Sequence, residues 1–158
     1  MIRAPHSPAA RRVLGAAAAI ALTVTLSGCG VLGSVFGQGN VFTIKVGDCF
    51  NEGTYTDGEI SDVDIVDCSQ LHELEATKSV ILTDASYPGD AAIQARGDSE
   101  CLAAFEEYTG QSYDTFTDWD YTFYWPTTGS WEGGDREILC LVGNIDGPVT
   151  GSVKNFAG

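Results

Sequence analysis

Apolar and small residues recur at spacings of three and four across residues 91–109, which is the period of an α-helix. On a helix they form one stripe, made of Ile93, Gly97, Cys101, Ala104, Phe105 and Tyr108. Asp90 is placed to cap the first turn, and Gly110 suits the left-handed conformation that ends a helix. Because glycine costs about 1 kcal/mol of helix propensity, Gly97 within the stripe predicts a close backbone contact.

Five further stretches predict β-strands, because they are rich in β-branched or aromatic residues or alternate between apolar and polar positions. They are residues 41–46, 60–68, 75–82, 119–125 and 136–142. In the second stretch acids alternate with apolar residues, so the acids are expected to face solvent. Residues 51–58 and 126–130 are expected to be loops, and residues 145–158 are expected to be mostly irregular.

The cysteines favour two disulfides over a zinc site. Cys49, Cys68, Cys101 and Cys140 contain no Cys-x-x-Cys pair, and His72 is the only histidine after residue 28. Of three possible pairings, packing of the helix on the sheet favours Cys101 with Cys140, which leaves Cys49 with Cys68. Each bridge would contribute about 3–4 kcal/mol. The elements predict an α+β fold: a small antiparallel sheet with one main helix packed on it and two disulfides.

The N-terminus has the layout of a secretory signal. Three arginines precede an apolar run of 14 residues, 13–26, and small residues then lead into Cys29. A helix needs about 20 residues to cross a bilayer, so the run is expected to be cleaved. Leu26-Ser27-Gly28-Cys29 resembles the lipobox of bacterial lipoproteins, which implies a diacylglycerol on Cys29. The expected organisation is a signal peptide at 1–28, a flexible tether at 29–40 and one folded domain at 41–158.

Charge limits the partners of the mature chain. Removal of residues 1–28 takes away three arginines and no acid, which changes the formal charge from −14 to −17. Such a surface repels phosphate groups, so nucleic acid and anionic lipid headgroups are unsuitable partners. Attachment to a membrane would therefore depend on the lipid at Cys29.

Several short motifs occur in a fixed order along the chain. They are Val46-Gly47-Asp48-Cys49-Phe50, Cys68-Ser69-x-x-His72-Glu73, Tyr87-Pro88-Gly89-Asp90, Trp131-x-Gly133-x-Asp135-Arg136 and Thr150-Gly151-Ser152. Together they resemble the septum formation domain of actinobacterial envelope proteins, over residues 46–154. The resemblance implies a cell-envelope protein associated with division septa, and it brings no catalytic residues.

Aromatic residues are concentrated in one stretch, since eight of the 16 lie between residues 113 and 131. On a strand, alternate residues share a face, so Trp119, Tyr121, Phe123 and Trp125 would form one row. Such a row either fills the core or stacks on sugar rings, and the core is favoured because a small domain has few other large residues. The candidate binding residues are Trp119, Tyr121, Trp125, Trp131 and Arg136.

Signatures of catalysis are scarce. The chain has no Gly-x-Ser-x-Gly or His-Glu-x-x-His motif, and the pair His72 and Glu73 is the only imidazole–acid pair after residue 28. A lone histidine near a cysteine is more often structural than catalytic. Acidic groups such as Asp62, Asp64 and Asp67 do not match a calcium-binding loop. We expect no enzyme activity, no cofactor and no metal.

The predicted function is that of a non-catalytic, lipid-anchored cell-envelope protein with an interaction or accessory role linked to septum formation. The alternative is a cell-wall glycan-binding module that uses residues 119–125. The expected location is the outer face of the cytoplasmic membrane. The expected partners are the membrane, through the lipid on Cys29, and an envelope protein or a wall glycan.

Overall fold

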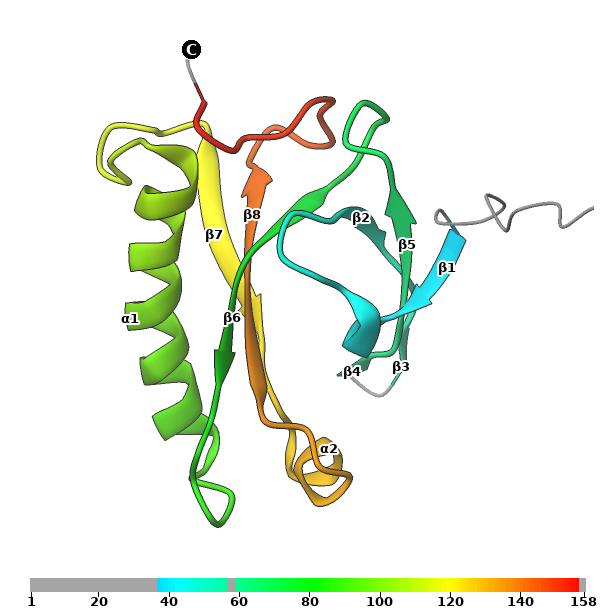
Figure 1. The fold of residues 1–158 in the computed structure, drawn as a ribbon, viewed down its shortest axis with the longest axis vertical. Helices are drawn as coiled ribbons and strands as arrows, with labels where there is room; N and C mark the ends of the chain where they lie inside the picture. The colour runs from blue at the N-terminus through cyan, green and yellow to red at the C-terminus, as the bar shows by residue number, and fades with distance from the viewer. Residues whose placement is uncertain (1–36, 57–58, 157–158) are drawn as a thin grey trace, which may run out of the picture. The chain divides into compact units, whose positions relative to one another are not determined.

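A six-stranded antiparallel sheet dominates the computed structural model, which describes residues 37–56 and 59–156 (Figure 1). The order of strands across it is β1-β5-β2-β6-β8-β7. These strands are β1 (Gly37–Asn40), β2 (Cys49–Glu52), β5 (Asp62–Val66), β6 (Leu74–Ile81), β7 (Trp119–Tyr124) and β8 (Glu137–Asn144). A separate hairpin consists of β3 (Tyr55–Thr56) and β4 (Glu59–Ile60). The helical elements are the 3-10 helix η1 (Val41–Thr43) and the α-helices α1 (Asp90–Thr109) and α2 (Thr128–Glu132).

The long helix α1 packs on β6, β7 and β8 (Figure 1). All six residues of the predicted apolar stripe are buried. Gly110 ends the helix with a φ of 72°, as expected. A Cβ built on Gly97 would lie 2.4 Å from the ring of Phe123, so the close contact at this position is confirmed, with an aromatic ring of β7 as the neighbour.

Strand β8 is buried on both faces and connects two regions of the core. Ile138 and Cys140 pack towards α1, as the alternation of apolar residues predicts. Leu139 and Leu141 point to the opposite face, where they pack in a cluster with Phe50 and other residues of the β1-β5-β2 half. A central strand with no solvent-exposed face reads as a continuous apolar run, which is the pattern of this segment.

Two disulfides brace the fold, and both have the predicted pairing. Cys49 at the start of β2 is bonded to Cys68, which follows β5. Cys101 on α1 is bonded to Cys140 on β8, so the helix is covalently joined to the central strand that it covers. The α+β fold predicted from the sequence is therefore confirmed.

The predicted strands at 60–68, 75–82, 119–125 and 136–142 correspond to β5, β6, β7 and β8, but the strand predicted at 41–46 is wrong. Its first three residues form η1, because the side chain of Asn40 accepts a hydrogen bond from the amide of Phe42 at 3.0 Å. The following residues turn, and the Asp48 carboxylate accepts from the amide of Lys45 at 2.8 Å. Local side-chain acceptors here outweigh β propensity.

Both predicted loops contain regular structure. Residues expected in the loop at 51–58 complete β2, which pairs with both β5 and β6, and then begin the β3–β4 hairpin. Residues expected in the loop at 126–130 begin α2, where Thr127 and Ser130 form a reciprocal capping box. Side-chain caps of this kind stabilise short helices.

Two predicted boundaries also change. Gly89 occupies the N-cap position of α1, and Asp90 is instead the first helical residue, where its carboxylate accepts a hydrogen bond from the hydroxyl of Tyr87. Residues 37–40, which were expected to belong to the tether at 29–40, instead pair with β5 as the edge strand β1. The expected signal peptide and Cys29 lie outside the described residues.

Candidate functional site

A buried carboxylate holds the C-terminal segment against the sheet. Glu75 on β6 is 2% exposed. Its Oε1 accepts hydrogen bonds from Tyr108 Oη at 2.7 Å and Ser152 Oγ at 2.5 Å, and its Oε2 accepts from the amide of Val153 at 2.8 Å. Burial and the Glu75 carboxylate raise the pKa of Tyr108 above its ordinary value. Three donors from α1 and the C-terminal segment therefore converge on one side chain of the sheet.

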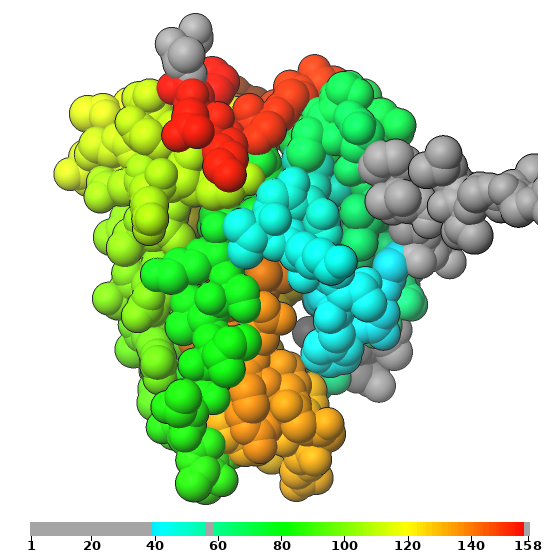
Figure 2. Space-filling view, viewed as in Figure 1, coloured from blue at the N-terminus to red at the C-terminus, as the bar shows by residue number. Residues whose placement is uncertain are grey.

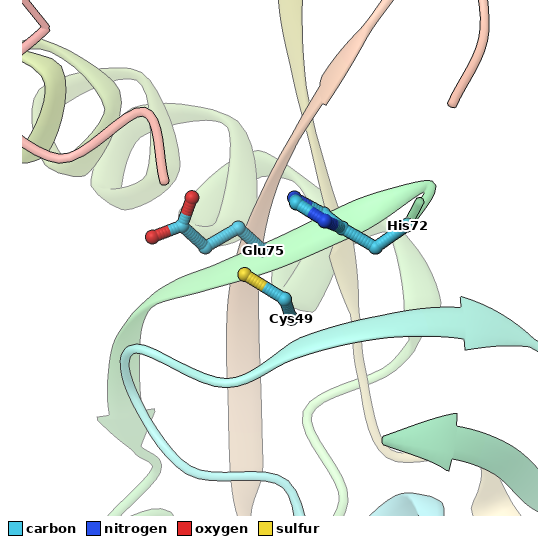
Figure 3. Close-up of side chains that lie close together, drawn as sticks. All are labelled: Cys49, His72 and Glu75. Carbon is cyan, nitrogen blue, oxygen red and sulfur yellow. The ribbon is translucent and has the colours of Figure 1, made fainter. Parts of the chain in front are cut away.

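Cys49 and His72 lie beside this carboxylate, and their ligand atoms fall within 4.8 Å of one another and of Glu75 (Figure 3). The Cys49 sulfur is already bonded to Cys68, and both oxygens of Glu75 accept hydrogen bonds. His72 Nδ1 lies 2.9 Å from the carbonyl oxygen of Gln70. A metal needs free thiolate, imidazole and carboxylate donors. These three side chains already make bonds within the protein, so their role here is to hold the fold.

The aromatic row of β7 packs mainly inwards. Trp119 and Tyr121 pack against the cluster around Phe105, and Phe123 packs beneath α1. These residues therefore do not form the exposed sugar-stacking face that the glycan alternative requires. Trp125 differs, because it follows the end of β7 and is 40% exposed.

Trp131 and Arg136 form a structural unit near α2. Trp131 is 6% exposed and packs edge-on against Tyr87, with ring centroids 5.6 Å apart. The Arg136 guanidinium lies 3.6 Å from the centroid of the Trp131 ring, and its Nη1 donates to the carbonyl oxygens of Trp131 and Asp135. Both arginine contacts and the stacked ring fix the turn between α2 and β8.

A groove of about 290 Å³ opens on the face of the sheet opposite α1. Figure 2 shows a gap between the cyan atoms around η1 and the orange atoms of α2 and β8. Three of its lining side chains are exposed aromatics, namely Phe42 at 61%, Tyr55 at 55% and Trp125 at 40%. Its acidic lining residues are Glu52, Glu59, Asp135 and Glu137.

Neutral donors hold three of these four carboxylates in place. Tyr124 Oη donates to Glu52 at 2.6 Å, and Ser130 Oγ donates to Asp135 at 2.9 Å. Glu137 accepts from the hydroxyl of Ser79. Burial and Glu52 raise the pKa of Tyr124, and desolvation together with Glu52 raises the pKa of Tyr55 to about 12. Both phenols therefore stay neutral at physiological pH.

The sequence predicts Trp125 as a candidate binding residue, and residues 122–125 of the groove belong to the strand of the glycan-binding alternative. It does not predict the other groove residues. The groove combines residues from η1, the β3–β4 hairpin, the end of β7 and the start of β8. No local spacing signals that assembly. The burial of Glu75 was not predicted either, because nothing in the sequence distinguishes a buried acid in a β-rich run from an exposed one.

Two mycobacterial proteins resemble this chain over most of its length. The protein LppN of Mycobacterium tuberculosis strain H37Rv, whose name includes the word lipoprotein, is 30% identical over 115 residues. That alignment covers 70% of this chain and 62% of LppN. The uncharacterized membrane protein Rv3835 of the same strain is 28% identical over 107 residues, which cover 61% of this chain and only 23% of Rv3835. No solved structure matches the chain significantly.

A family model described as "Septum formation" matches residues 46–156. The matched region runs from the turn before β2 to the C-terminal segment, and it includes both disulfides, the buried carboxylate and most of the groove. The chain therefore belongs to the septum formation family.

Proposed function

We propose that this chain is a non-catalytic, lipid-anchored protein of the cell envelope that acts as an interaction or accessory partner in septum formation. The observation that carries the proposal is the family match over residues 46–156. The lipobox ending at Cys29 supports a lipid anchor, and so does the similarity to a relative named as a lipoprotein. In the described part of the chain no helix is both long enough and apolar enough to span a bilayer.

A binding role, not a catalytic one, agrees with how the polar core is used. His72 and Glu75 are buried groups with acid–base chemistry, and both are engaged by backbone or hydroxyl partners. General acid–base catalysis needs a positioned group that can reach a substrate proton. At 2% exposure each of these side chains is closed off from the surface.

The test is the location of a C-terminal fusion to a fluorescent protein that matures outside the cytoplasm, observed in dividing cells. We expect membrane fluorescence concentrated at nascent septa, and we expect Cys29→Ala to release it from the membrane fraction. This control leaves both disulfides intact, because Cys29 belongs to neither. Uniform membrane signal would contradict the septal role, and membrane retention of a variant from which residues 1–28 have been cleaved would contradict the lipid anchor.

A further inference from the structure

No ion pair among the described residues includes a carboxylate of the groove opposite α1. None of its lining residues is a lysine, an arginine or a histidine. The two ion pairs among residues 37–56 and 59–156 are Lys78–Glu100 and Arg96–Asp84, and neither includes a groove carboxylate. Arg136 adjoins the groove residues Asp135 and Glu137 in sequence, but its guanidinium packs over the Trp131 ring and forms no ion pair with either carboxylate. Hydroxyl donors position three of the four carboxylates, but a neutral donor does not cancel their charge.

The aromatic residues of the groove supply the complementary feature. Phe42, Tyr55 and Trp125 are large apolar side chains that stay at least 40% exposed at the same groove. Aromatic faces attract cations within about 6 Å through their quadrupole. Carboxylates and exposed ring faces around one small cavity therefore select for positive charge attached to an apolar chain.

Other ligand classes fit less well. Anions would be repelled by the four carboxylates. A neutral sugar could donate hydroxyls to the carboxylates, but three of the four already accept a hydroxyl of the protein, and the sugar carries no charge to offset theirs. A bare metal ion needs converging oxygen ligands. Among the described residues, Cys49, His72 and Glu75 form the group whose possible metal-ligand atoms all lie within 4.8 Å of one another. None of these three residues lines the groove.

We propose that this groove binds an organic cation, specifically an alkylammonium group, with its methylene chain against the exposed aromatic rings and its ammonium near the carboxylates. The volume of about 290 Å³ lies near the lower end of ordinary ligand pockets, which suits one such group and its chain. The ammonium can come from a free diamine or from a lysine side chain of a peptide.

The experiment is a titration of the isotopically labelled full chain, in which binding is followed by amide NMR shifts at low salt. The probes are 1,5-diaminopentane and N-acetyl-lysine amide, each beside a neutral isostere, 1-pentanol and N-acetyl-norleucine amide. A wall disaccharide of N-acetylated sugars serves as a further probe. We expect the amines to shift the amide resonances of Tyr55, Glu59 and Trp125. We expect the neutral isosteres to bind at least about fivefold more weakly than the amines.

Two groove variants make the proposal falsifiable. Glu59 is exposed and accepts no side-chain hydrogen bond within the described residues, and Tyr55 is also exposed, so Glu59→Gln and Tyr55→Leu should fold normally. We expect each to weaken amine binding about three- to fivefold, with no change in the control Glu107→Gln on α1. Equal loss in the control, equal binding of amines and isosteres, or preference for the disaccharide would overturn the proposal.

Binding of the diamine alone would identify a free small molecule as the source, and binding of both amines would identify a side chain as well.

Discussion

Substitution of Glu75 tests whether its hydrogen bonds hold the C-terminal segment to the sheet. Glu75→Met removes the acceptor of the hydroxyls of Tyr108 and Ser152 and of the amide of Val153. The hydroxyls can rotate, but the buried amide cannot. A buried donor left without a partner costs about 1–3 kcal/mol. Adding a smaller cost for the hydroxyls, we expect the free energy of unfolding to fall by about 2–4 kcal/mol.

Glu75→Gln should behave differently, because an amide can replace all three contacts. Its oxygen can accept from the amide of Val153, and its NH₂ group can donate to both hydroxyl oxygens. Only the added strength of a charged acceptor is lost, and the cost of burying a charge is removed as well. We therefore expect a loss of about 1 kcal/mol or less.

Urea unfolding followed by tryptophan fluorescence measures both variants, with the exposed Glu107→Gln as the control expected to change stability by less than about 0.5 kcal/mol. Hydrogen exchange should also show faster exchange at Val153 in the Met variant than in the Gln variant. Equal losses for Met and Gln would show that the three hydrogen bonds do not account for the role of Glu75. A Met variant more stable than the native protein would show that burial of the charge costs more than the bonds return.

Three further outcomes are expected. Gly97→Ala should lower the free energy of unfolding by about 1–2 kcal/mol although alanine has the better helix propensity, because the new Cβ overlaps the Phe123 ring. Urea unfolding measures this, with Ser99→Ala at an exposed position of the same helix as the control. A gain in stability for Gly97→Ala would refute the close contact. Loss of the Cys101–Cys140 bridge, whose cysteines are 39 positions apart in sequence, should cost about 4 kcal/mol in thermal unfolding. Because the pKa of Tyr108 is raised above 10.0 in the folded state, its contribution is complete below pH about 10 and is lost as the pH rises further, which tyrosinate absorbance can follow.

Periodicity predicted the parts of the fold in which one pattern extends over several turns or residues. The stripe through Gly97 and Cys101 specified both the buried face of α1 and the bridge partner on β8. Prediction failed in short segments, where one side chain decides the outcome. Residues 41–46 are rich in β-formers, yet the Asn40 side chain bonds the local backbone and η1 forms instead.

The groove and the buried carboxylate could not be predicted, because both depend on which strands become neighbours. Glu52 meets Tyr124 across 72 positions of sequence, and Glu75 meets Val153 across 78. Such pairs follow from sheet order and register, which local spacing does not determine. Trp125 was found because aromatic density is a local signal, whereas its neighbours in the groove are distant in the chain.

The order of the two disulfides has a consequence for how the chain matures. Each bridge joins cysteines that are consecutive along the described chain, Cys49 with Cys68 and then Cys101 with Cys140. When a chain emerges from a channel N-terminus first, Cys49 and Cys68 are both available before Cys101 appears. Oxidation in the order of emergence therefore yields the native pairs directly, without the slow thiol exchange that interleaved bridges require. On the proposed route, in which the chain crosses the membrane N-terminus first and a lipid occupies Cys29, the two bridges should form without the help of a disulfide isomerase.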